Sequence, residues 1–213
     1  MARMYFGKTL MSPHTVNEKE VAKTKFGASV DTWIGDVDEN GVLQKPTVQN
    51  KLNFAGVTEI GKWALPYAFY GCKSITSVDL SSLQSVGYSG LSNAFRDCTG
   101  ITSVDLSYLT TVGGNGLYWA FGNCTGITSV DLSSLHGVEN QGLLYAFAYC
   151  RSLTTISFPS LTSVQTNSLD YAFLNCTNLT EIHFRADMQT TIEALDGFSS
   201  KFGATNATIY FDL

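Results

Sequence analysis

The chain has 213 residues and a formal net charge of −5, with 44% hydrophobic but only 15% charged residues. This composition predicts a folded protein whose polar surface consists mostly of uncharged side chains. The negative net charge argues against a nucleic-acid-binding protein, which would carry a basic stripe. No apolar run is long enough to predict a membrane span.

Residues 1–48 form an N-terminal segment outside the repeats that follow. The first twenty residues lack the continuous apolar stretch of a signal peptide, so none is predicted. The stretch "DENG" at 38–41 predicts a β-hairpin, since Asn-Gly favours a two-residue turn. "DVDENG" also resembles the start of a calcium loop, but Thr47 stands where a bidentate Glu is required, so the hairpin is favoured. The segment is predicted to be a cap or an attachment piece.

Residues 49–185 carry a 26-residue repeat. All five cysteines keep this interval: Cys72, Cys98, Cys124, Cys150 and Cys176. An Ala-Phe pair precedes each of them, and columns of Ile or Leu and of Val or Ile follow at the same interval. A fixed period of this length predicts a solenoid, in which each unit buries its apolar side by stacking on its neighbours.

Two hydrophobic spacings alternate within each repeat. Leu117, Phe121 and Cys124 show the spacing of one face of a short helix, whereas Val130 and Leu132 alternate with polar residues as in a half-buried strand. Glycines precede the helical stretch, where a tight turn would need them. They are Gly90, Gly116 and Gly142.

These spacings together predict the fold class. Stacked strands lie ~4.8 Å apart, whereas helix axes need ~8–10 Å, so a stack of both must curve. We therefore expect a right-handed α/β solenoid of horseshoe shape, with strands on the concave side and short helices on the convex side. Residues 186–213 are predicted to be a C-terminal capping coil, because 209–211 echo 182–184 with one residue of slip.

The pattern Ile127-x-x-Val130-x-Leu132 is the core of a leucine-rich repeat. Residues 172–184, "AFLNCTNLTEIHF", resemble the BspA-like leucine-rich repeats of bacterial surface proteins. The repeats here are longer than is common in that family, and only Pro159 keeps the proline that often follows the strand. The resemblance implies a non-enzymatic protein-recognition or adhesion module at the cell surface or outside the cell. The alternative is a structural or host-recognition component of a phage, because residues 26–44 faintly resemble leader segments of tail-associated proteins.

Two columns are candidate ligand-binding surfaces. The first is Asp79, Asp105 and Asp131, which we expect side by side on the strand face. It could bind a cation or a basic partner, or its members could simply bond to the nearby Ser81, Ser107 and Ser133. The second is the aromatic column Tyr67, Trp119, Tyr145 and Tyr171, which Asn93 interrupts. It could contact a protein or the face of a sugar, or it could pack along the rim of the solenoid.

The remaining polar and sulfur-bearing residues predict neither catalysis nor a cofactor. The cysteines are never closer than 26 residues, which fits no metal-ligand spacing, and we expect them to be buried and free of disulfides. The three histidines share no column with a nucleophile, so no enzyme is predicted. The expected partner is a protein or possibly a glycan. Oligomeric state does not follow from the sequence.

Overall fold

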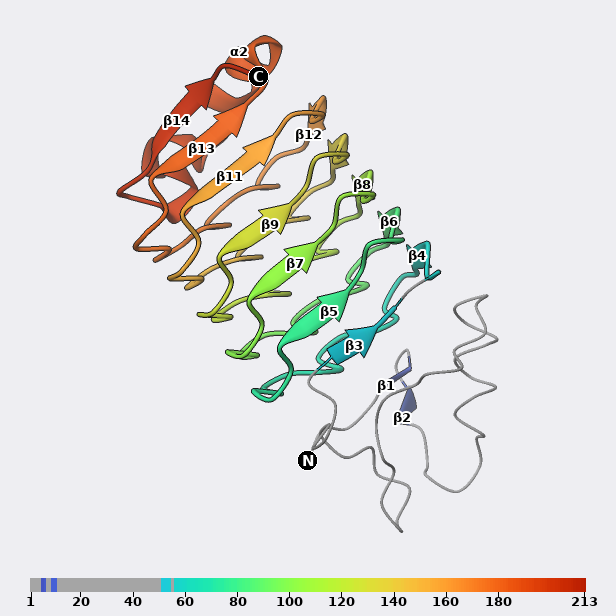
Figure 1. Ribbon diagram of the computed structural model, residues 1–213. Coiled ribbons are helices and arrows are strands. Elements are labelled where there is room, and N and C mark those ends of the chain that lie inside the picture. The colour runs from blue at the N-terminus through green and yellow to red at the C-terminus, as the bar shows by residue number, and fades with distance from the viewer. Residues whose placement is uncertain (1–4, 7–8, 11–50, 55) are drawn as a thin grey trace.

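A computed structural model describes residues 5–6, 9–10, 51–54 and 56–213 (Figure 1). Tyr5–Phe6 (β1) and Thr9–Leu10 (β2) form an antiparallel pair. The hairpin and the calcium loop considered at 36–47 lie outside the described residues. From residue 51 onward the chain winds as a parallel β-solenoid.

One side of every coil is a strand of a first parallel layer, which consists of a four-stranded and a three-stranded sheet. Its strands pair in steps of 26 residues, so that Val78 lies beside Val104 and Val104 beside Val130. The last pair is offset by 27 residues, with Ile182 beside Ile209. The strands are Lys51–Asn53 (β3), Ser77–Asp79 (β5), Ser103–Asp105 (β7), Ser129–Asp131 (β9), Thr155–Phe158 (β11), Glu181–Phe184 (β13) and Thr208–Phe211 (β14).

A second side is a five-stranded parallel sheet in the order β12-β10-β8-β6-β4. Each of its strands contributes one outward residue and one inward valine or isoleucine. The strands are Glu59–Ile60 (β4), Ser85–Val86 (β6), Thr111–Val112 (β8), Gly137–Val138 (β10) and Ser163–Val164 (β12).

The third side, which we call the turn face, corrects the sequence prediction. The stretches expected to be short helices are successions of turns. The N–H of Ala120 donates to the carbonyl of Leu117 at 2.9 Å, whereas the N–H of Phe121 donates to Ala146 of the next coil at 2.9 Å. Every fourth residue has a left-handed backbone, as at Trp119 (φ 54°) and Asn123 (φ 59°). A helix cannot form because alternate N–H groups pair with the neighbouring coil.

The predicted horseshoe depended on helices that would force the coils apart. On the turn face the coils instead pair by backbone hydrogen bonds, as they do on the two strand faces. All three sides therefore stack at similar spacing. In Figure 1 the coils follow one another along a nearly straight line, so the horseshoe is not confirmed.

The core lies between the three faces and repeats coil by coil. Phe121 is fully buried and stacks on Phe95 at 5.3 Å and on Phe147 at 5.6 Å between ring centroids. The sequence spacing therefore identified the buried residues of the turn face correctly, although it misassigned their backbone conformation.

The glycines before the turn face close tight turns, as predicted: the N–H of Gly90, for example, donates to the carbonyl of Gly87 at 2.9 Å. None of Gly90, Gly116 and Gly142 has a positive φ. A Cβ at Gly142 would lie 2.6 Å from Val138 Cγ1, and one at Gly116 would lie 2.9 Å from the carbonyl oxygen of Gly113. These positions need glycine because the chain packs closely on itself there.

Within the described residues, helices occur only near the C-terminus. They are the 3₁₀ helix Ala186–Met188 (η1), the α-helix Gln189–Glu193 (α2) and the 3₁₀ segment Phe198–Gly203 (η2). The N–H of Phe173 donates to the carbonyl of Phe202 at 3.0 Å, so η2 continues the bonding of the turn face. No helix in the described part of the chain could cross a membrane.

Candidate functional site

The three predicted aspartates form one row across β5, β7 and β9, with Asp105 in register between Asp79 and Asp131. Each carboxylate accepts a hydrogen bond from the backbone N–H two residues further on. These bonds come from Ser81 at 3.1 Å, Ser107 at 3.0 Å and Ser133 at 2.9 Å. Such bonds close a turn at the end of each strand. The expected hydrogen bonds to the nearby serines are therefore present, and a ligand role for the row stays a prediction.

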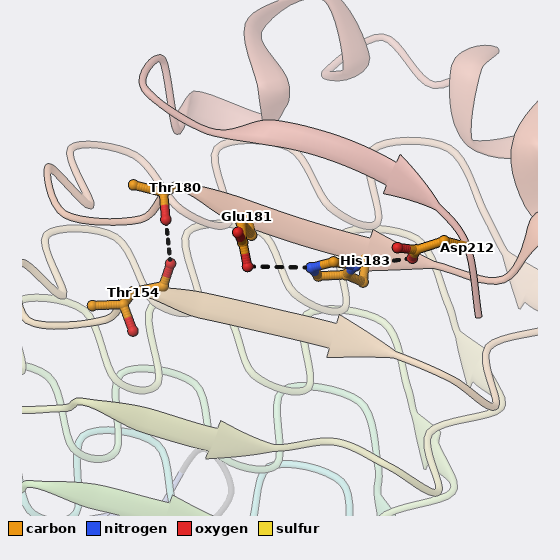
Figure 2. Close-up of polar contacts among 5 residues, drawn as sticks. All are labelled: Thr154, Thr180, Glu181, His183 and Asp212. Carbon is orange, nitrogen blue, oxygen red and sulfur yellow. Dashed lines mark hydrogen bonds and ion pairs between the residues drawn. The ribbon is translucent and has the colours of Figure 1, made fainter.

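The same 26-residue column includes His183, which lies in register beside Ser157 and is flanked by two carboxylates (Figure 2). Its Nδ1 lies 2.9 Å from Asp212 Oδ1, and its Nε2 lies 3.5 Å from Glu181 Oε2. The ring stacks on Tyr210 at 4.8 Å. The hydrogen bond with Asp212 raises the pKa of His183. Both ring nitrogens face carboxylates, so the cluster links β13 to the end of β14 and leaves neither nitrogen to activate a nucleophile.

Three of the four predicted aromatic residues form a continuous stack on the turn face, which we call the aromatic ladder. Trp119 lies 4.7 Å from Tyr145 with an interplanar angle of 12°, and Tyr145 lies 5.1 Å from Tyr171 at 7°. These separations match the rise from one coil to the next. The sequence column therefore becomes a real row of side chains, with Trp119 and Tyr145 partly covered and Tyr171 exposed.

Tyr67, the fourth member of the column, lies apart from this stack. Asn93 interrupts the column and is buried, and Tyr67 contacts Tyr70 instead, at 6.0 Å. Arg96 bridges the gap, because its guanidinium lies 4.2 Å from the Trp119 ring centroid and 6.0 Å from that of Tyr70. It also donates to Asn93 Oδ1 at 3.2 Å.

Sequence reasoning missed four residues around the aromatic column. They are Tyr70, Arg96, Tyr118 and Tyr149. Tyr118 meets Tyr145 edge-on at 6.4 Å, and the Tyr149 ring is stacked near Trp119 at 6.2 Å. Their columns vary from coil to coil, so no repeated signal identifies them. Only knowledge of how the turns fold could have placed them on one face.

The surroundings of the turn face raise the pKa of two of its tyrosines. The neighbouring Asp97 carboxylate raises the pKa of Tyr70, and burial raises the pKa of Tyr145. Burial also raises the pKa of Asp170, and the charge of Asp196 raises it further. The hydroxyls of Tyr70 and Tyr145 therefore remain hydrogen-bond donors at neutral pH.

All five cysteines are buried, as the sequence predicted, and none of them forms a disulfide. Their thiols bond to the preceding coil, as where Cys98 Sγ donates to the carbonyl of Phe69 at 3.0 Å and Cys124 Sγ to that of Phe95 at 3.0 Å. Burial raises the pKa of Cys176 to about 12. Among the described residues no group of three or more His, Cys, Asp or Glu is placed to hold a metal ion.

Comparison with known proteins shows that the chain matches one protein family. A family model described as "BspA type Leucine rich repeat region" matches residues 58–199 in six copies. Similar solved structures include a leucine-rich repeat protein from Bacteroides ovatus (TM-score 0.31, 14% identity, 76% of this chain and 60% of that one). Another is a leucine-rich cell surface protein from Faecalibacterium prausnitzii (TM-score 0.27, 14% identity, covering 68% of this chain and 66% of that one). This chain thus spans less than two thirds of either structure's length. No curated protein matches significantly.

Proposed function

Because the chain belongs to the BspA-type leucine-rich repeat family, we propose that it is a non-enzymatic protein-recognition or adhesion module. The observation that carries this proposal is the aromatic ladder with its neighbouring rings. Residues that contribute most to protein binding are usually Trp, Tyr and Arg. The turn face has all three, whereas the outer face of the first strand layer has mostly Ser, Thr and Asp.

The stacking within the ladder favours a protein over a sugar as the ligand of this face. Trp119 and Tyr145 are nearly parallel at 4.7 Å, so each covers one face of the other. Arg96 covers the other face of Trp119, and Tyr171 covers that of Tyr145. A sugar that stacks on an aromatic ring needs an open face. Trp119 and Tyr145 instead present ring edges and a hydroxyl, which suit the mixed apolar and polar contacts of a protein interface.

The ladder is also held in place before any partner binds. Stacked neighbours restrict each ring, and the left-handed backbone of Trp119 and Tyr145 is fixed by bonds to the next coil at Leu144 and Asp170. Binding therefore costs little side-chain entropy. The row at Asp79, Asp105 and Asp131 offers the second, weaker candidate surface, since its carboxylates are already hydrogen-bonded.

The test is a binding screen of the purified protein against immobilised extracellular-matrix proteins, followed by matched variants. Trp119→Asn removes the first ring of the ladder but keeps the left-handed backbone, because Asn93 adopts φ 55° in the same column. We expect affinity for the matrix protein that binds to fall about 30-fold, the effect of losing roughly 2 kcal/mol. Tyr67→Asn is the control, because it makes the same change in the same column outside the ladder.

A second pair of measurements separates the two surfaces. Binding through the ladder should persist as salt is raised, whereas binding through carboxylates weakens. Retained affinity in Trp119→Asn together with lost affinity in Asp105→Asn would move the site to the aspartate row. The absence of binding to any matrix protein would contradict the adhesion role. Neither the family match nor the similar structures support the phage alternative.

A further inference from the structure

A hollow of about 460 Å³ lies over the second sheet, on a different side of the solenoid from the aromatic ladder. Its floor is the outward residue of each strand: Glu59, Ser85, Thr111, Gly137 and Ser163. The side chains along the middle of this row are small, and Gly137 has none. The inward Val86, Val112 and Val138 are buried beneath it. The hollow is therefore a polar trough that runs across successive coils.

One wall of the trough consists of larger side chains that bonds between coils hold in place. Glu139 Oε2 accepts the backbone N–H of Gly114 at 3.0 Å, and Gln165 Oε1 accepts that of Asn140 at 3.0 Å. Each side chain thus reaches back to the preceding coil. The wall is preformed, so a ligand would not have to order it.

An aromatic ring completes this wall towards the N-terminal end. The Tyr88 ring lies against Gly114, where a Cβ would approach its Cδ2 to 3.1 Å. Trp63 meets Tyr88 edge-on at 5.3 Å, and the Lys62 ammonium lies 5.5 Å from the ring centroid. Trp63 and Tyr88 are each 44% exposed. The trough therefore combines hydroxyls, the carboxylates of Glu59 and Glu139, an amide and the partly exposed Tyr88 ring, against which Trp63 packs.

Two ligand classes fit this lining poorly. A peptide strand gains affinity by pairing with a sheet edge, but β6, β8 and β10 already pair on both sides, so their backbone groups are used within the sheet. A single metal ion is unsuited, because Glu59 and Glu139 lie on coils three steps apart, or ~14 Å at the usual strand spacing.

We infer that the trough binds a neutral oligosaccharide. Each sugar hydroxyl donates and accepts hydrogen bonds, which matches a lining of Ser and Thr hydroxyls, the second oxygen of the Glu139 carboxylate and the Gln165 side-chain amide. The partly exposed Tyr88 supplies an apolar surface for the carbon–hydrogen side of a sugar ring. The site does not rest on the protein recognition proposed for the turn face.

The test uses isothermal titration with a panel of neutral tetra- to hexasaccharides of glucose, mannose, galactose and N-acetylglucosamine. Gly137→Phe fills the trough: a Cβ there would meet only Thr111 Cγ2, at 4.0 Å, and φ is not positive. We expect at least one saccharide to bind, and Gly137→Phe to weaken it about tenfold or more. Tyr88→Ala should weaken the same saccharide, whereas Trp119→Asn on the turn face should leave it unchanged.

Several outcomes would overturn the inference. No saccharide binding at about 5 mM would do so, as would binding that Gly137→Phe leaves intact. A salt-sensitive interaction of tetralysine with this trough in place of any saccharide would show that Glu59 and Glu139 define a cation-binding surface instead. If the melting temperature of Gly137→Phe is lower than that of the wild type, Ser163→Phe serves as the second variant, because it fills the same trough from β12.

Discussion

Replacement of Phe121 by alanine removes the central ring of the buried phenylalanine stack. Phe121 is 0% exposed, and its ring lies 5.3 Å from Phe95 and 5.6 Å from Phe147. Truncation of a buried Phe costs about 3–5 kcal/mol. The variant also loses two ring contacts, each worth ~0.5–1.5 kcal/mol beyond the buried area. We therefore expect the loss of stability to lie towards the upper end of the range for a buried Phe. Backbone bonds to the neighbouring coils, such as that from Phe121 to Ala146, also prevent the cavity from collapsing.

The assay is urea denaturation followed by circular dichroism. Tyr108→Ala is the control, because Tyr108 is 61% exposed and its loss should change the free energy of unfolding by no more than about 0.5 kcal/mol. If Phe121→Ala does not fold, Phe121→Leu should still cost about 1–2 kcal/mol. A loss in Phe121→Ala no larger than that in Tyr108→Ala would refute the stacked core.

Three further predictions concern other parts of the solenoid. A thiol reagent should find none of the five cysteines in the native protein and all five after denaturation without reductant; a lower final count would reveal disulfides. His183→Gln should lower the melting temperature more at about pH 5.5 than at about pH 8.5. The protonated ring stabilises the fold fully below its ordinary pKa of 6.5, and this contribution is lost as pH rises through the raised pKa. An equal decrease in melting temperature at both pH values would contradict this contribution. Asn123→Val should cost ~1–2 kcal/mol more than Asn123→Gly, because φ at this position is 59°; matching stabilities in a thermal melt would contradict the left-handed backbone.

The buried residues of the turn face were predictable, but its backbone was not. Leu117, Phe121 and Cys124 are all fully buried, as their spacing predicted. A succession of turns repeats every four residues, and that period places nearly the same residues inward as a helix does. The spacing alone therefore could not separate the two conformations.

One sequence signal for the turns was available. Asn, Asp and Gly tolerate a left-handed backbone, and the column Gly71, Asp97, Asn123, Tyr149 and Asn175 is rich in them. The aromatic column gave the opposite signal, because Trp and Tyr residues rarely adopt a left-handed backbone. The φ values of 54° at Trp119 and 56° at Tyr145 persist because ring stacking and bonds to the next coil offset the strain.

The candidate surfaces were predictable only in part. The aspartate row and the aromatic column follow directly from the 26-residue period, which places equivalent residues side by side. Arg96 over Trp119 depends on a contact between different columns, and the trough depends on how the chain bends after each strand of the second sheet. Neither follows from a linear period.

The 26-residue coil as the structural unit is tested most directly by deletion of residues 98–123. This deletion joins Asp97 to Cys124, so a left-handed residue again precedes the buried cysteine and every column keeps its register. We expect the shortened protein to keep the circular dichroism spectrum of the parent and to melt cooperatively, because coils contact only their neighbours. Deletion of residues 98–110 shifts all later columns by half a period and should prevent folding. Equal loss of structure in both deletions would contradict the coil as the unit.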